Sequence, residues 1–304
     1  MDKLNKSQQY WIKRMDEIMV YVDKTDLDFF DELQSIYTEN CQSIQKEIYK
    51  FYAQYAKENR ISMQEAKKRL MREDLSDYRE NAKKYFKAAK KDPQLLKRLN
   101  EQYRAGKVTR LEALQLDLLY QLGVMRGDLE QSFNDYLKEV AKYAYRKISG
   151  GNSASTLNLP ALEQLVNTPF NGKNYSQSIW GNVDDLANDL RNTLVKGFVR
   201  GLGPAEMARE LRKKYNVARS RAEAIIRTDG TNIINNATAK RYIDAGFTEY
   251  EYLAHIDNRT TEICKGLNGD VFKLTDFQPG LNAPPMHVNC RSTIIPSKKE
   301  LRDV

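Results

Sequence analysis

Cysteine and histidine are scarce in this chain of 304 residues, which holds three Cys and two His. So few thiols exclude a disulfide-dense secreted fold, and the His-Glu-x-x-His motif of zinc proteases is absent. Two of the three cysteines and both histidines nevertheless fall within residues 252–296. Because these residues are so sparse elsewhere, their gathering predicts either a site or a structural staple in this stretch.

Other features that define membrane proteins and common enzymes are also missing. No apolar run approaches the roughly 20 residues that span a bilayer, and the N-terminus lacks the apolar core of a signal peptide. Neither a glycine-rich phosphate-binding loop nor a Gly-x-Ser-x-Gly motif occurs. We therefore expect a protein without a membrane segment, folded in a cytoplasm, that is neither a packaging ATPase nor a serine hydrolase.

Helix-forming patterns fill the N-terminal half, where glycine and proline are few. Apolar residues recur at helical spacing from Trp11 to Val22, and Thr25, Ser62 and Thr109 are candidate caps at which further helices begin. The helix after Thr109 is expected to break near Gly123 or Gly127. The run 149–155 is rich in serine and glycine and indicates a linker. The predicted organisation is a helical domain at 1–148, a linker at 149–158 and a second domain at 159–304.

The second half mixes helix and strand signals. Helices are predicted near 160–167 and 176–199, and then at 204–215 and 218–245, a pair whose spacing resembles a DNA-reading helix-turn-helix. Strands are predicted at 248–256 and 293–295, with a short one at Val271-Phe272 behind the turn that contains Gly269. The predicted fold class is mainly α: an elongated N-terminal helical domain followed by a smaller α+β C-terminal domain with a short sheet and Cys/His-bearing loops.

Positive charge is concentrated in one stretch. Residues 80–110 hold ten Lys or Arg against three acids, nearly the whole net charge of +8. Such a field attracts polyanions, although a solvated helix face would have the same composition. The candidate DNA-contacting residues are Lys83, Lys84, Lys87, Lys90, Lys91, Lys97 and Arg98.

The Cys/His stretch has the spacing C-x22-H-x2-C, formed by Cys264, His287 and Cys290. Thiolate and imidazole are ligands that zinc favours, and a structural zinc takes four of them, so His255 or Asp257 would have to supply the fourth. A disulfide between the two cysteines and plain packing of two thiols are the alternatives. The sequence leaves all three open.

Several motifs in this region carry a resemblance to a known family. Asp-x-Arg-Thr-x-x-x-Cys from Asp257, then Leu-x-Gly-x-Val-Phe, then Pro-Pro-x-His-x-Asn-Cys-Arg-Ser-Thr resemble the signature of phage minor head proteins of the Mu F-like head morphogenesis family. Arg227-Thr228-Asp229 and Asn235 resemble the helix motif of that family. The likeness covers roughly residues 180–296. The sequence departs from the family at Thr261 and Ser292, where many members carry cysteine, and at Asp229, where glutamate is commoner.

The resemblance implies a non-enzymatic protein inside the phage head, near the portal, made in the cytoplasm of a bacterial host. Its implied partners are the portal protein, capsid or scaffolding proteins and double-stranded DNA bound without sequence preference. No cofactor is firmly implied, and a structural zinc is possible. The residues expected to hold the C-terminal loops together are Asp257, Arg259, Thr260, Cys264, Gly269, His287, Asn289, Cys290 and Arg291.

Two other functions remain open from the sequence. The chain could be a free-standing DNA-binding protein that uses its basic helices. It could also be a metal-dependent nuclease built around His287, which would require a general base and an open metal position.

Overall fold

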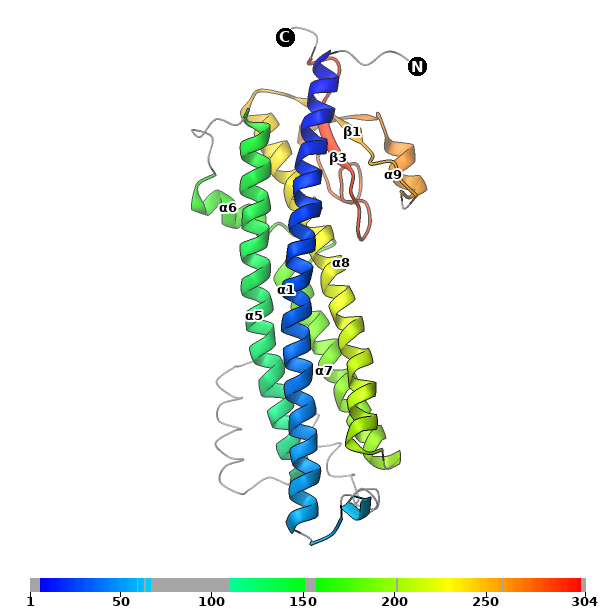
Figure 1. Cartoon of the computed structure of the whole chain (residues 1–304). Helices are drawn as coiled ribbons and strands as arrows, with labels where there is room; N and C mark the ends of the chain where they lie inside the picture. The colour runs from blue at the N-terminus through cyan, green and yellow to red at the C-terminus, as the bar shows by residue number, and fades with distance from the viewer. Residues whose placement is uncertain are drawn as a thin grey trace. The chain divides into compact units, whose positions relative to one another are not determined.

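The computed structural model describes residues 6–58, 60–62, 64–66, 110–150, 157–200, 202–258 and 260–301. Long helices dominate, and a small sheet lies near the C-terminus (Figure 1). The mainly helical fold with an α+β C-terminal region is therefore confirmed. The strongly basic residues from Lys83 to Arg98 lie outside the described residues, as does Arg259.

In the part of the chain that the structure describes, five helices precede the sheet: α1 (Lys6–Glu58), α5 (Arg110–Ile148), α6 (Leu159–Val166), α7 (Tyr175–Arg200) and α8 (Pro204–Asp244). None of the described helices is long and apolar enough to cross a membrane. The start of α6 shows why such helices begin where they do. The side chain of Asn158 accepts a hydrogen bond from the backbone N–H of Ala161, and proline occupies the first turn.

Three helix breaks predicted from the sequence are wrong. Helix α1 continues through Thr25, whose hydroxyl bonds the carbonyl of Tyr21 one turn back and so caps nothing. Helix α5 continues through Gly123 and Gly127. Helix α8 continues from Pro204 to Asp244, so the turn of the expected helix-turn-helix is absent and that reading fails.

The chain folds into two compact units, each made from separated segments. The first compact unit comprises residues 1–32, 130–179 and 222–304, and the second comprises 33–129 and 180–221. The four long helices each contribute residues to both units. The proposed division at 149–158 stays a prediction, and residues 151–156 of that linker lie outside the described residues.

The sheet belongs to the first compact unit and has the order β2-β1-β3, with both pairs antiparallel. Its strands are β1 (Glu249–Leu253), β2 (Val271–Lys273) and β3 (Thr293–Pro296). Alternate residues of β1 are buried, so Tyr250 and Tyr252 lie on its core face, where each is 0% exposed. The chain between β1 and β2 contains α9 (Glu262–Leu267), and η1 (Leu274–Asp276) follows β2.

Candidate functional site

Helix α9 fixes the position of Cys264. Thr261 is its N-cap, and the hydroxyl of Thr261 accepts a hydrogen bond from the backbone N–H of Cys264. After α9, Gly269 at φ 89° closes a turn in which the N–H of Asp270 donates to the carbonyl of Leu267. The cap and the turn together hold a helix of two turns between β1 and β2, with Cys264 on its buried side.

The loop before β3 carries the other two residues of the Cys/His stretch. The backbone N–H of Cys290 donates to the carbonyl of His287, which closes a tight turn and brings the two side chains to the same place. Asn289 inside this turn has φ 61°, a conformation that asparagine tolerates better than most residues.

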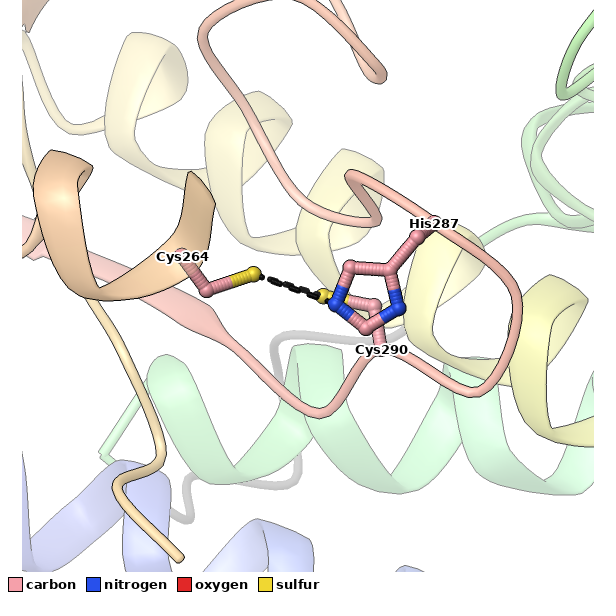
Figure 2. Close-up of side chains that lie close together, drawn as sticks. All are labelled: Cys264, His287 and Cys290. Atoms are coloured by element: carbon pink, nitrogen blue, oxygen red, sulfur yellow. Dashed lines mark hydrogen bonds between the residues drawn. The ribbon is translucent and has the colours of Figure 1, made fainter. Parts of the chain in front are cut away.

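The three side chains converge, as the sequence predicts. The sulfur of Cys264 lies 3.3 Å from Nε2 of His287 and 3.8 Å from the sulfur of Cys290. Figure 2 shows Cys264 pointing from α9 toward the other two side chains on their loop. The two sulfurs are not joined, since a disulfide would hold them at about 2.05 Å. Both cysteines are about 1% exposed and pack with Tyr252 and Ala254 in a small core.

The two thiols differ in acidity. Burial opposes ionisation of Cys264, but hydrogen bonds, of which the one from the Tyr252 hydroxyl at 3.3 Å is foremost, outweigh it and lower the pKa of Cys264 to about 7. Burial raises the pKa of the Cys290 thiol. A thiolate at Cys264 therefore forms readily near neutral pH, with a neutral thiol beside it.

The three donor atoms fit a zinc ion. They lie within 4.8 Å of one another. A tetrahedral zinc with Zn–S of about 2.3 Å and Zn–N of about 2.0–2.1 Å places its sulfurs about 3.8 Å apart and sulfur and nitrogen about 3.6 Å apart. The observed separations of 3.8 and 3.3 Å are close to these. Nδ1 of His287 lies 2.9 Å from the carbonyl of Val288, so Nδ1 carries the proton and Nε2 is free to bind a metal.

A fourth protein ligand is not part of this cluster. His255 and Asp257 line the same cavity as Cys264 and His287, but neither belongs to the group of three donors found among the described residues. Nε2 of His255 is 4.0 Å from a carboxylate oxygen of Asp257. The expectation that one of them completes the set is thus not met in this arrangement.

Side chains of helix α8 bind backbone groups of the loop before β3, residues 287–292, which we call the Cys/His loop. The Thr231 hydroxyl donates to the carbonyl of Cys290 at 2.7 Å, and the amide of Asn235 donates to the carbonyl of Ser292 at 3.2 Å. The Thr228 hydroxyl accepts from the N–H of Asn289 at 3.0 Å. These three side chains recur at three- and four-residue spacing on one face of α8, which lets them bind successive residues of an extended segment. Their role explains why Thr228 and Asn235 belong to the recognisable helix motif.

Thr231→Val tests this support. Valine has nearly the shape of threonine but cannot donate, so the buried carbonyl of Cys290 loses its partner. We expect a loss of about 1–3 kcal/mol in the free energy of unfolding, measured by denaturant titration. The matched control is Thr193→Val, whose hydroxyl bonds only a carbonyl of its own helix, that of Asp189. Equal losses in the two variants would contradict the support role.

Helix α1 supplies partners that the sequence motifs do not predict. Arg291, next to Cys290, forms an ion pair with Asp23. Nε of Arg227 lies 3.8 Å from a carboxylate oxygen of Asp26, and its guanidinium stacks over the ring of Phe30 at 4.6 Å. Asp26 also accepts a hydrogen bond from the Tyr136 hydroxyl. Arg227 and Arg291 are therefore each held by a carboxylate far away in sequence, and the only sequence signal for this was a pair of acids one turn apart in a helical pattern.

These groups surround a cavity of about 510 Å³. Its walls include Asp23 and Asp26 from α1, Arg227 from α8, and Cys264 and His287 from the C-terminal loops. Burial raises the pKa of Asp26, against the effects of its Tyr136 hydrogen bond and of Arg227. Each arginine of the cavity faces a carboxylate, so the charges of the wall are largely matched.

The remaining predicted residues have varied environments. Thr260 organises the loop before α9: its hydroxyl accepts from the N–H of Asp257 at 2.7 Å and donates to the carbonyl of His255 at 2.7 Å. Asp229 is buried, with 6% of its surface exposed, and burial raises its pKa to about 7. On α8, the side chains that bind the C-terminal loop are those of Thr228, Thr231 and Asn235.

Comparison with known proteins supports the resemblance seen in the sequence. Residues 188–295, about a third of the chain, match the family model described as "Phage Mu protein F like protein". All of the convergent Cys/His residues and the supporting side chains of α8 lie within this match. The family consists of structural phage-head proteins.

One curated relative is the Enterococcus faecalis (strain ATCC 700802 / V583) protein "NAD(+)--arginine ADP-ribosyltransferase EFV". It is 29% identical to this chain over 121 residues, which are 38% of this chain and 25% of that protein. The chain thus spans about a quarter of the length of this relative. No solved structure matches the chain.

Proposed function

We propose, from a chain whose residues 188–295 form a Mu F-like head-morphogenesis region, that this protein is a minor structural component of a tailed-phage head. The observation that carries the proposal is the docking of the Cys/His loop on α8. Side chains of the matched region bind backbone groups of that loop, which is how a scaffold is held together. The match to an ADP-ribosyltransferase covers a quarter of that protein, so we do not assign its activity to this chain.

The Cys/His cluster has a structural role in this proposal. The sheet has three short strands, so a link between α9 and the loop before β3 would stabilise the loops around it. Cys264, His287 and Cys290 would hold a zinc ion that ties α9 to the loop before β3. Zinc binding at such a site contributes to folding directly.

The proposed partners are a portal oligomer, capsid or scaffolding proteins, and DNA bound without sequence preference. We place the protein inside the head near the portal, after synthesis in the host cytoplasm. Aromatic side chains on the long helices support docking on another protein, since Tyr10, Tyr49 and Tyr120 are about half exposed. The sequence of the basic stretch at 80–110 supports weak attraction to DNA.

Co-expression with a portal protein tests this assignment. We expect the chain to co-purify with the portal ring and to stay bound as salt is raised, because contacts with apolar anchors resist salt while nonspecific DNA binding falls steeply with it. Nuclease treatment of the lysate is the control, since it removes any bridge made by DNA. Loss of the complex after nuclease treatment, or failure to co-purify at low salt, would overturn the portal assignment.

A further inference from the structure

We propose that Cys264 and Cys290 form a modification site, at which hydrogen peroxide oxidises the two thiols to a disulfide and so withdraws both sulfurs from a bound metal ion. The two sulfurs lie 3.8 Å apart and are not joined. The formation of the disulfide rests on this geometry alone. Only the accompanying loss of zinc rests on the structural role proposed above for the Cys/His cluster.

The two cysteines belong to separate short elements of the first compact unit. Cys264 lies in α9, a helix of six residues, and Cys290 lies in the Cys/His loop, 26 residues further along the chain. Figure 2 shows the side chain of Cys264 directed from α9 toward that of Cys290. A disulfide holds its sulfurs at about 2.05 Å, so oxidation requires them to approach by about 1.8 Å from the observed 3.8 Å. Rotation of two side chains and a small shift of the loop supply such a movement.

One of the two sulfurs lies at the wall of a cavity. Cys264 lines the cavity of about 510 Å³ that also includes His255 and Asp257, whereas Cys290 is not among the residues that line it. Both cysteines are about 1% exposed, which protects them from large reagents. An oxidant as small as hydrogen peroxide fits into the cavity and meets Cys264 first, with Cys290 behind it as the second thiol.

The oxidation balances with hydrogen peroxide as its oxidant. The sulfur of Cys264 attacks one peroxide oxygen, the O–O bond breaks, and hydroxide leaves with the thiol proton as water. Cys264 is then a sulfenic acid, oxidised by two electrons, and the peroxide has been reduced. The sulfur of Cys290 next attacks that of Cys264, the S–O bond breaks, and a second hydroxide leaves with the proton of Cys290 as water. Where a metal ion holds both sulfurs as thiolates, solvent supplies the two protons and the ion is released.

The third cysteine of the chain is a matched control. Cys41 lines another cavity, of about 310 Å³, in the second compact unit and is 4% exposed. Its sulfur accepts a hydrogen bond from the amide of Gln45 at 3.2 Å, and the sequence has no other cysteine in that unit. Cys41 therefore resembles Cys264 in burial and in its place at a cavity wall, but it has no second thiol within its own unit.

The experiment treats the purified full chain with hydrogen peroxide in modest molar excess. Free thiols are then blocked, the digested chain is analysed by mass spectrometry, and released zinc is followed with a chromogenic indicator. We expect the peptides of Cys264 and Cys290 to become joined, with the release of about one zinc ion per chain. Dithiothreitol should restore both thiols. Cys41→Ser should form the same disulfide, and Cys290→Ser should leave a sulfenic acid at Cys264 that dimedone captures.

The parent chain alone decides the proposal, so the test holds even if Cys290→Ser does not fold. A disulfide in a parent chain that held no zinc supports the modification site and contradicts only the zinc assignment. If the parent holds zinc but peroxide does not join Cys264 to Cys290, the modification site is overturned and the zinc assignment stands. Oxidation of Cys264 to a sulfinic acid, retention of zinc by the disulfide form, or equally extensive linkage through Cys41 would also overturn it.

Discussion

Elemental analysis of the purified protein is expected to find about one zinc ion per chain, and a chelator is expected to unfold residues 248–296. The reason is that the sulfur of Cys264 lies at distances close to those between zinc ligands from both Nε2 of His287 and the sulfur of Cys290, and that all three donor atoms lie within 4.8 Å of one another. Structural zinc contributes on the order of 10 kcal/mol to folding at such sites. Hydrogen exchange across β1, α9 and β3 would measure the loss of structure.

The chain offers a matched control for this prediction in its second histidine. His287→Ala removes a ligand and should abolish zinc retention, whereas His255→Ala changes a residue of the same cavity outside the three-donor group and should retain the metal. If the parent protein holds no zinc and the chelator has no effect, the thiols are only packed. Cys264→Ala would then cost roughly 1–3 kcal/mol, as ordinary core changes do.

Thr261→Cys extends the same test. Thr261 precedes Cys264 by one helical turn and already lies in hydrogen-bonding contact with it. A thiol at that position would add a fourth ligand, so the variant should hold zinc more tightly than the parent in a competition with a chromogenic chelator. Unchanged or weaker retention would show that the N-cap hydroxyl matters more here than an additional sulfur.

The C-terminal region was predictable because its signals are local. The turn that contains Gly269, the proline pair before His287 and the short apolar runs fixed the strands and loops, and the Cys/His spacing predicted their convergence. What could not be predicted was the support from outside the motifs. Asp23 and Asp26 lie more than two hundred residues before Cys264, and nothing in their local pattern says which arginines they meet.

The predicted helix boundaries were wrong where a local stop signal competed with tertiary packing. Thr25 and Gly127 are a candidate cap and a helix breaker, yet both lie within continuous helices. In α8, Tyr215 and Ala218 are both buried on the same side of the helix, so packing in the second compact unit holds the helix straight through the expected turn. Such packing outweighs propensities that amount to about 1 kcal/mol per residue.

Asp229 provides the second large expected effect. It belongs to the helix motif that resembles the Mu F-like family, yet its carboxyl is buried, with 6% of the residue exposed, rather than placed at the Cys/His cluster. Desolvation is the cause of its raised pKa, which moves from 3.8 to about 7. The folded protein therefore keeps a proton on Asp229 over a range of pH in which the unfolded chain has lost it.

The sign of the pH dependence follows from this difference. Between about pH 4 and pH 7 the folded state binds more protons than the unfolded state, so the stability owed to Asp229 is present at the acidic end and is lost as the pH rises through the folded pKa. A difference of about three pKa units corresponds to a destabilisation on the order of 4 kcal/mol above pH 7. Asp26 and Glu251 have pKa values raised by burial and add slopes of the same sign.

Asp229→Asn removes the charge while keeping the size of the side chain. We expect the variant to be more stable than the parent at pH 8, by up to a few kcal/mol, to match it near pH 4, and to show a flatter dependence of unfolding free energy on pH in between. Denaturant titrations across this range measure the effect. Asp28→Asn, at an exposed position of α1, is the control and should leave the curve unchanged. A variant less stable than the parent at pH 8 would mean that the Asp229 carboxylate is compensated by a bound cation or partner, and the desolvation argument would then be wrong.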